Sequence, residues 1–155
     1  EECLERNFNY YISRTSHGST LSRLVHADLA YTTGKYDLGW QFYLEALKSD
    51  LTDIQGGTTG EGIHCGVMAG TVYSALSIFC GLDFSLEVPE ICPDLPDNWK
   101  SIQFTFLFRG TIYKVAISKT EVKIICRNDK KNKIKIHLCG REHELLDNQL
   151  VSFKL

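Results

Sequence analysis

The first third of the chain repeats apolar residues at helical spacing. Leu21, Leu24, Val25 and Leu29 recur every three or four positions, which places them on one face of a helix that Gly34 would end. The next stretch keeps this period, and its apolar members are Tyr36, Trp40, Tyr43, Leu44, Leu47 and Leu51. The pattern therefore predicts two amphipathic helices joined by a short turn.

A third apolar stretch, from about residue 63 to residue 79, follows a glycine-rich turn at residues 56–60. Its apolar side chains cover nearly the whole circumference, so other helices should surround it, and its small residues, Ala69, Gly70 and Ala75, would let them approach closely. Two partners cannot cover such a helix, and the Phe8–Tyr11 segment has no evident structural partner. We therefore expect a part of a larger helical assembly, with a homodimer as the alternative.

After Gly81 the apolar period changes from helical spacing to alternation, beyond a connector interrupted by prolines. Strands are predicted at residues 103–108, 111–117, 121–126, 133–138 and 150–153. The predicted fold class is α+β. We place a helical domain at residues 1–82 and a small antiparallel β-domain at residues 83–155.

Composition and charge narrow the range of partners. Apolar residues make up 43% of the chain and charged residues 23%, as in ordinary globular domains. A net charge of −2 provides no basic field for nucleic acid, and no apolar stretch reaches the roughly 18 residues that a membrane-spanning helix needs. The basic run from Lys130 to Lys135 is expected to be a solvated hairpin tip. We expect neither nucleic acid nor a membrane as a partner.

The six cysteines show no local pairing signal. None forms a C-x-x-C pair or stands at zinc-finger spacing from histidine, and the first residues, Glu1-Glu2-Cys3, carry no secretory signal. We therefore predict reduced cysteines, no metal site and a cytoplasmic location for the protein.

Two polar segments lead into predicted helices and carry the candidate chemistry. The first, Thr15-Ser16-His17-Gly18-Ser19-Thr20, offers hydroxyls where the free N–H groups of a helix N-terminus attract anions; ordinary N-capping is the alternative. The second, residues 56–64, sets Glu61 and His64 on one face of a helical turn after several glycines; a loop with a buried histidine is the alternative. Side by side, the two segments would form one pocket for an anion and a polyhydroxyl ligand.

Catalytic groups are harder to identify from the residues. The chain has no G-x-S-x-G nucleophile elbow, and its second polar segment lacks the G-K-[ST] ending of a P-loop. Cleavage of a glycosidic bond needs two carboxyl groups, or one acid and an external nucleophile such as phosphate. Glu61 is the single well-placed acidic candidate, and the sequence offers no obvious second one.

Three stretches carry a resemblance to a known family. Residues 15–22 read T-S-H-G-S-T-L-S with His26 four residues on, residues 53–64 read D-I-Q-G-G-T-T-G-E-G-I-H and lead into M-A-G-T, and residues 95–110 run from L-P-D-N-W to F-R-G. Over about residues 8–125 the chain resembles glycoside hydrolase family 65, the family of maltose, trehalose and kojibiose phosphorylases. The second stretch is long and specific.

The resemblance implies a fold, a reaction and a set of contacts. The fold would be the last helices of an (α/α)6 toroid followed by a C-terminal β-sandwich. The reaction would be inverting phosphorolysis of an α-linked glucose disaccharide, which yields β-glucose 1-phosphate. By match to the family's motifs, the phosphate contacts fall on Ser19, Thr20 and His64, with His17 and Gly18 close by.

The resemblance also implies what the chain lacks. Glu61 is assigned to sugar hydroxyls or to the shape of the pocket, whereas the general acid belongs to an earlier helical loop that has no match here. We therefore expect a C-terminal fragment that is inactive without the missing N-terminal part, with inorganic phosphate as co-substrate and no cofactor. A fragment of a family 65 hydrolase and a non-catalytic carbohydrate- or anion-binding protein derived from the family are the alternatives.

Overall fold

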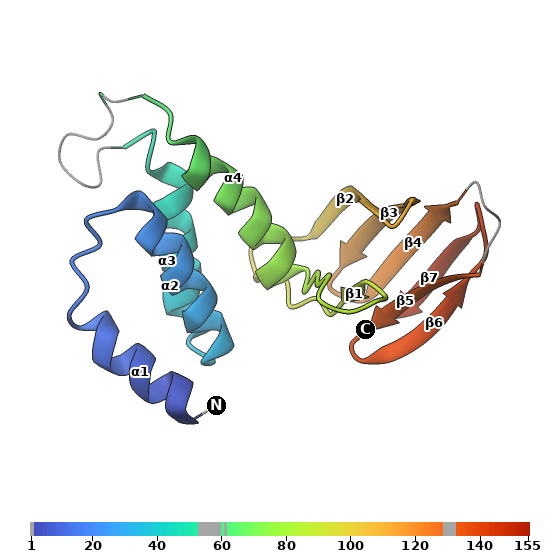
Figure 1. The fold of residues 1–155 in the computed structure, drawn as a ribbon, viewed down its shortest axis with the longest axis horizontal. Coiled ribbons are helices and arrows are strands. Elements are labelled where there is room, and N and C mark those ends of the chain that lie inside the picture. The colour runs from blue at the N-terminus through green and yellow to red at the C-terminus, as the bar shows by residue number, and fades with distance from the viewer. Residues whose placement is uncertain (1, 53–59, 61, 129–132) are drawn as a thin grey trace. The chain divides into compact units, whose positions relative to one another are not determined.

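The computed structural model describes residues 2–52, 60, 62–128 and 133–155, in two compact units, Glu1–Ala75 and Leu76–Leu155. Helices make up the first unit, and strands dominate the second (Figure 1). This arrangement confirms the α+β class. Within the described ranges, no helix is long and apolar enough to span a membrane. Lys130 and Lys131, from the predicted hairpin tip, lie outside the described residues.

The described part of the first unit contains four α-helices. They are α1 (Glu2–Ile12), α2 (Thr20–Thr32), α3 (Tyr36–Lys48) and α4 (Cys65–Ser74), which continues into a π-helical segment at Ala75–Phe79. The three helices predicted from apolar spacing are confirmed. Helix α1 escaped the pattern because it buries one side chain, Phe8, which lies 6.3 Å from the His26 ring between centroids.

The core of this unit lies where α2, α3 and α4 meet. Leu24, Ala46 and Val67 form a buried cluster, with Met68 packed against it. A methyl group at Gly70 would lie 2.4 Å from the terminal carbon of the Leu24 side chain, so the glycine lets Leu24 pack directly on the backbone of α4. The prediction that small residues let neighbouring helices approach is thus confirmed at this position.

The opposite face of α4 is not covered by the described residues. Val72 is 63% exposed and Tyr73 is 70% exposed, although Val67 on the packed face is 1% exposed. The expectation that helices surround this apolar stretch is therefore met on one side only within this chain.

The second unit contains two sheets whose inner faces share a core. One has the order β2-β3-β4-β7, formed by β2 (Ser101–Phe108), β3 (Thr111–Ser118), β4 (Glu121–Arg127) and β7 (Leu150–Lys154), all antiparallel. The other has the order β1-β5-β6, formed by β1 (Glu90–Ile91), β5 (Ile134–Leu138) and β6 (Arg141–Leu145). The strictly antiparallel sheet that we predicted needs one correction, because β1 pairs with β5 in parallel.

Alternation along the strands divides each sheet into a buried and an exposed face. In β3 and β4, Val115, Ile117, Val122 and Ile124 are buried while the side chains between them are more exposed. The Tyr113 hydroxyl donates a hydrogen bond to the Lys135 carbonyl oxygen at 3.2 Å, which links β3 to β5. The apolar alternation therefore locates the core of this unit correctly.

Strand β6 was not predicted, because its sequence, Arg-Glu-His-Glu-Leu, is poor in strand-forming residues. Its acidic side chains face lysines across the ladder. Lys133 Nζ lies 3.0 Å from a Glu144 carboxylate oxygen, and Lys135 Nζ lies 2.7 Å from a Glu142 carboxylate oxygen. Cross-strand charge pairs of this kind support a register that local propensity does not favour.

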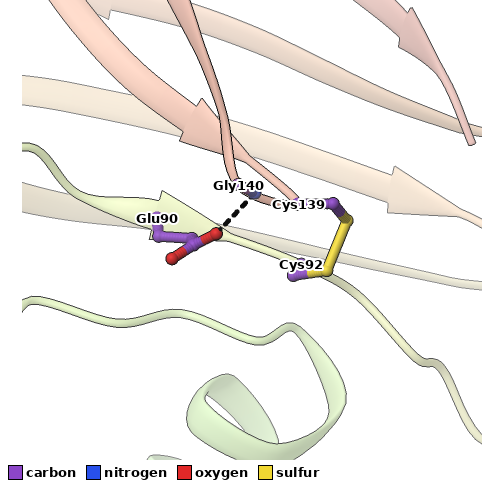
Figure 2. Close-up of a disulfide and its surroundings, with 4 residues drawn as sticks. All are labelled: Glu90, Cys92, Cys139 and Gly140. Carbon is purple, nitrogen blue, oxygen red and sulfur yellow. Dashed lines mark hydrogen bonds between the residues drawn. A yellow bond between two sulfur atoms is a disulfide. The ribbon is translucent and has the colours of Figure 1, made fainter.

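A disulfide between Cys92 and Cys139 ties the end of β1 to the turn between β5 and β6 (Figure 2). The Gly140 N–H donates to the Glu90 carboxylate at 2.7 Å, and the Cys139 N–H donates to the Ile91 carbonyl oxygen at 3.1 Å. The prediction of reduced cysteines is wrong for this pair. The two cysteines are 47 residues apart, so only the parallel pairing of β1 with β5 brings them together.

Reduction of this disulfide is expected to destabilise the second unit by about 4 kcal/mol, because a loop of this length gains that much entropy in the unfolded chain. Urea unfolding followed by the fluorescence of Trp99, in a Trp40→Phe background, measures the change. Cys3→Ser, at an exposed free thiol, is the control and should leave the midpoint unchanged. An unfolding curve insensitive to dithiothreitol would show that the bond does not form.

Candidate functional site

The N-terminal ends of α2 and α4 lie side by side at one end of the helical unit (Figure 1). A methyl group placed on Gly66, in the first turn of α4, would lie 3.9 Å from the Leu21 side chain, in the first turn of α2. Leu24, one turn further along α2, and Val67, next to Gly66 in α4, share the buried cluster. The structure therefore brings together the helix starts that follow the two polar segments.

The hydroxyl-rich segment ends at the start of α2. Ser19 occupies the N-cap position in an extended conformation, and its side chain makes no capping hydrogen bond. Ser19 and Gly18 are exposed, whereas Thr20 is buried. Ser19 thus stands at the N-cap position, as the capping alternative predicts, but its hydroxyl does not cap the helix. The anion-binding role of this hydroxyl stays a prediction.

His17 points back into the helical unit rather than standing alone on the loop. Its Nδ1 atom lies 3.0 Å from the Ser22 hydroxyl, and His26 Nδ1 lies 2.8 Å from the Ser22 carbonyl oxygen. The His17 ring contacts the rings of His26 and Phe42, with centroid distances of 4.6 Å and 5.0 Å. These contacts hold the loop that carries His17 against α2 and α3.

An ion pair between the buried Arg23 and the partly exposed Glu45 supports the same loop and was missed from the sequence. Arg23 is 8% exposed, and its Nε donates to a Glu45 carboxylate oxygen at 2.9 Å. A terminal nitrogen of Arg23 also donates to the His17 carbonyl oxygen at 3.4 Å. The sequence did contain a signal for a buried charge: Arg23 directly precedes Leu24, which lies on the apolar side of a predicted helix.

His64 stands at the N-cap position of α4 and is held by Asp50, just beyond the end of α3. Its Nδ1 lies 2.6 Å from one Asp50 carboxylate oxygen, and its backbone N–H donates to the other at 2.9 Å. The Asp50 side chain is 10% exposed and that of His64 is 25% exposed. Sequence reasoning named neither this carboxylate nor its contact with His64.

The remaining candidate from the second polar segment cannot be placed. Glu61 lies outside the described residues, as do residues 53–59. Its assignment to the sugar stays a prediction. Among the residues that are described, no group of three His, Cys, Asp or Glu side chains is arranged to hold a metal ion.

Burial lowers the pKa of His17 below its ordinary value of 6.5. The neighbouring His26 and Arg23 act in the same direction, and Glu45 opposes them. These surroundings favour the neutral form of the ring in the folded unit.

The depressed pKa of His17 predicts a pH dependence of stability. Below pH 6.5 the unfolded chain binds more protons at this residue than the folded chain, so the stabilisation is present above pH 6.5 and is lost as the pH falls through the folded pKa. Chemical denaturation between pH 7 and pH 5 should show a shallower decline for His17→Gln than for the wild type. An NMR titration midpoint of His17 above 6.5 would contradict the assignment.

Comparison with known proteins identifies the family of the chain. The family model described as the glycosyl hydrolase family 65 central catalytic domain matches residues 1–73, and that of the family's C-terminal domain matches residues 83–145. The chain belongs to glycosyl hydrolase family 65. Its helical part corresponds to the central catalytic domain, and its β-part to the C-terminal domain.

Similar proteins of this family include several phosphorylases. The chain is 38% identical over 134 residues to trehalose 6-phosphate phosphorylase of Lactococcus lactis, covering 86% of this chain and 17% of that protein. It is 32% identical over 146 residues to kojibiose phosphorylase of Caldanaerobacter subterraneus, covering 94% of this chain and 19% of that protein.

A solved structure shares the fold. It comes from the human microbiome, is provisionally named kojibiose phosphorylase, and superimposes with a TM-score of 0.82 at 30% sequence identity. The match covers 98% of this chain and 20% of that one. The chain therefore spans about a fifth of the length of the relatives that it matches.

Proposed function

We propose that this chain forms the phosphate side of the active site of an inverting α-glucoside phosphorylase. The observation that carries the proposal is the pair of adjacent N-termini of α2 and α4, where the exposed Ser19, the buried Thr20 and the partly exposed His64 lie at the helix starts. The phosphorylases among the relatives, which match both parts of the chain, support the same reaction class.

The arrangement suits a doubly charged anion for physical reasons. Each helix N-terminus carries a partial positive charge on its N–H groups, and two of them side by side add their fields at one point. The Ser19 and Thr20 hydroxyls add hydrogen-bond donors, and Gly18 leaves room for phosphate close to the backbone. His17, packed on His26, would support the loop that carries Gly18 and Ser19.

In the proposed reaction, a phosphate oxygen forms a bond to the anomeric carbon while the bond from that carbon to the leaving oxygen breaks. The leaving sugar takes its proton from a general acid, which we place in an N-terminal part of the enzyme outside this chain. The product is β-glucose 1-phosphate. Glu61 would hold sugar hydroxyls beside the phosphate.

The architecture of the whole enzyme is part of the proposal. The helical part, which we place at residues 1–82, would supply the last helices of an (α/α)6 toroid, and residues 83–155 would form the C-terminal β-sandwich. The exposed apolar face of α4, at Val72 and Tyr73, supports coverage by further helices or by a second subunit. We also propose a cytoplasmic location, where the Cys92–Cys139 bond would be open to reduction.

Phosphate dependence tests the reaction. The full-length enzyme should convert one of trehalose, trehalose 6-phosphate, maltose, kojibiose or nigerose to a β-glucose 1-phosphate product only when inorganic phosphate is present. The present 155-residue chain alone should turn over none of them, because it lacks the acid. Equal turnover without phosphate would favour the hydrolase, and ligand binding without any turnover would favour the non-catalytic alternative.

Substitution of His64 tests the site. His64→Ala in the full-length enzyme should raise the KM for phosphate about tenfold or more, since a hydrogen bond to a charged group contributes about 1.5–3 kcal/mol. The KM for the disaccharide should change little. His143→Gln, at a histidine of β6 that contacts Phe153, is the control. An unchanged phosphate KM in His64→Ala would remove His64 from the site.

A further inference from the structure

We propose that Asp50 is a positioning residue that holds the His64 ring for phosphate. The inference rests on the proposed phosphorylase function and adds a residue that lies outside both polar segments. The evidence is a two-point contact: one carboxylate oxygen meets Nδ1 of the ring at 2.6 Å, and the other accepts the backbone N–H of the same residue at 2.9 Å.

The first contact determines the tautomer of the ring. An ionised carboxylate only accepts hydrogen bonds, so the proton of this contact resides on Nδ1. Any exchange of a proton with a ligand then occurs at Nε2. That nitrogen can accept from the P–OH group of hydrogen phosphate, or can donate to a P–O⁻ group when the ring carries a second proton.

The second contact determines where the ring stands. Because the same carboxylate binds both the backbone and the ring of His64, it limits rotation of the side chain and fixes it against the start of α4. Asp50 lies two residues beyond the end of α3, and its side chain is 10% exposed, so it is itself held by the packed helical unit. Asp50 therefore connects the packed helices to the His64 ring through these two hydrogen bonds.

The charge of Asp50 favours a role in positioning His64 over a role in which Asp50 itself meets the phosphate. A nearly buried carboxylate close to an anion site would repel phosphate if its charge were unbalanced. Here both oxygens accept hydrogen bonds from His64, beside the positive end of the α4 helix. A simple N-cap of α4 would need only the backbone contact and would not require a charged group.

A double-mutant cycle in the full-length enzyme tests the proposal, with inorganic phosphate and the accepted disaccharide as ligands. Asp50→Asn preserves size and an acceptor for the backbone N–H but removes the charged partner of Nδ1. It should raise the KM for phosphate about tenfold and leave the KM for the disaccharide within about twofold. In a His64→Ala background it should add nothing, because Asp50 acts only through the ring.

Asp37→Asn, in the first turn of α3 at the end remote from Asp50, is the matched control and should change neither KM. If Asp50→Asn lowers the melting temperature markedly, Asp50→Ser is tested in its place, because serine retains an oxygen that can accept the backbone N–H of His64. An Asp50→Asn effect of equal size with and without His64, or an equal rise of both KM values, would overturn the inference. A wild-type rate independent of phosphate would overturn the proposed function and this inference together.

Discussion

The close approach of α4 to α2 is the constraint on which the candidate site depends. The Leu24 side chain packs directly over Gly70, where a methyl group would lie 2.4 Å from its terminal carbon, so a larger residue would have to displace the end of that side chain. The same packing continues through Val67 to the first turns, so it decides the distance between the two helix N-termini. An anion pocket built from helix ends needs this distance to be held by the core, since the loops alone could not hold it.

Around this packing, charged residues hold the polar segments in place. Arg23 and Glu45 join α2 to α3 beneath the His17 loop, and Asp50 joins the end of α3 to His64. Arg23 and Asp50 are largely buried, and a charge in such a place is costly unless it is paired, so both contacts favour the packed arrangement of the helices. In the second unit the charge pairs lie on the surface instead, where Lys133 and Lys135 pair with the glutamates of β6.

Much of the fold follows from residue patterns in this chain. Helical spacing located α2, α3 and α4, and alternation located β2, β3, β4, β5 and β7. The patterns failed where structure rests on few or distant contacts. Helix α1 buries only Phe8, strand β6 consists mostly of charged and polar residues, and β1 is a two-residue pairing with a strand far along the chain. In each case the stabilising partner lies outside the local sequence.

The sequence by itself determined the family, the α+β class and the two polar segments, because motifs, periodicity and helix-start chemistry are local properties. Only the tertiary structure decided that the N-termini of α2 and α4 stand side by side, that His17 packs inward on His26 and Phe42, and that Asp50 holds His64. It also decided the pairing of Cys92 with Cys139. These relations join residues on different elements, and the packing that brings them together leaves no trace in the local pattern.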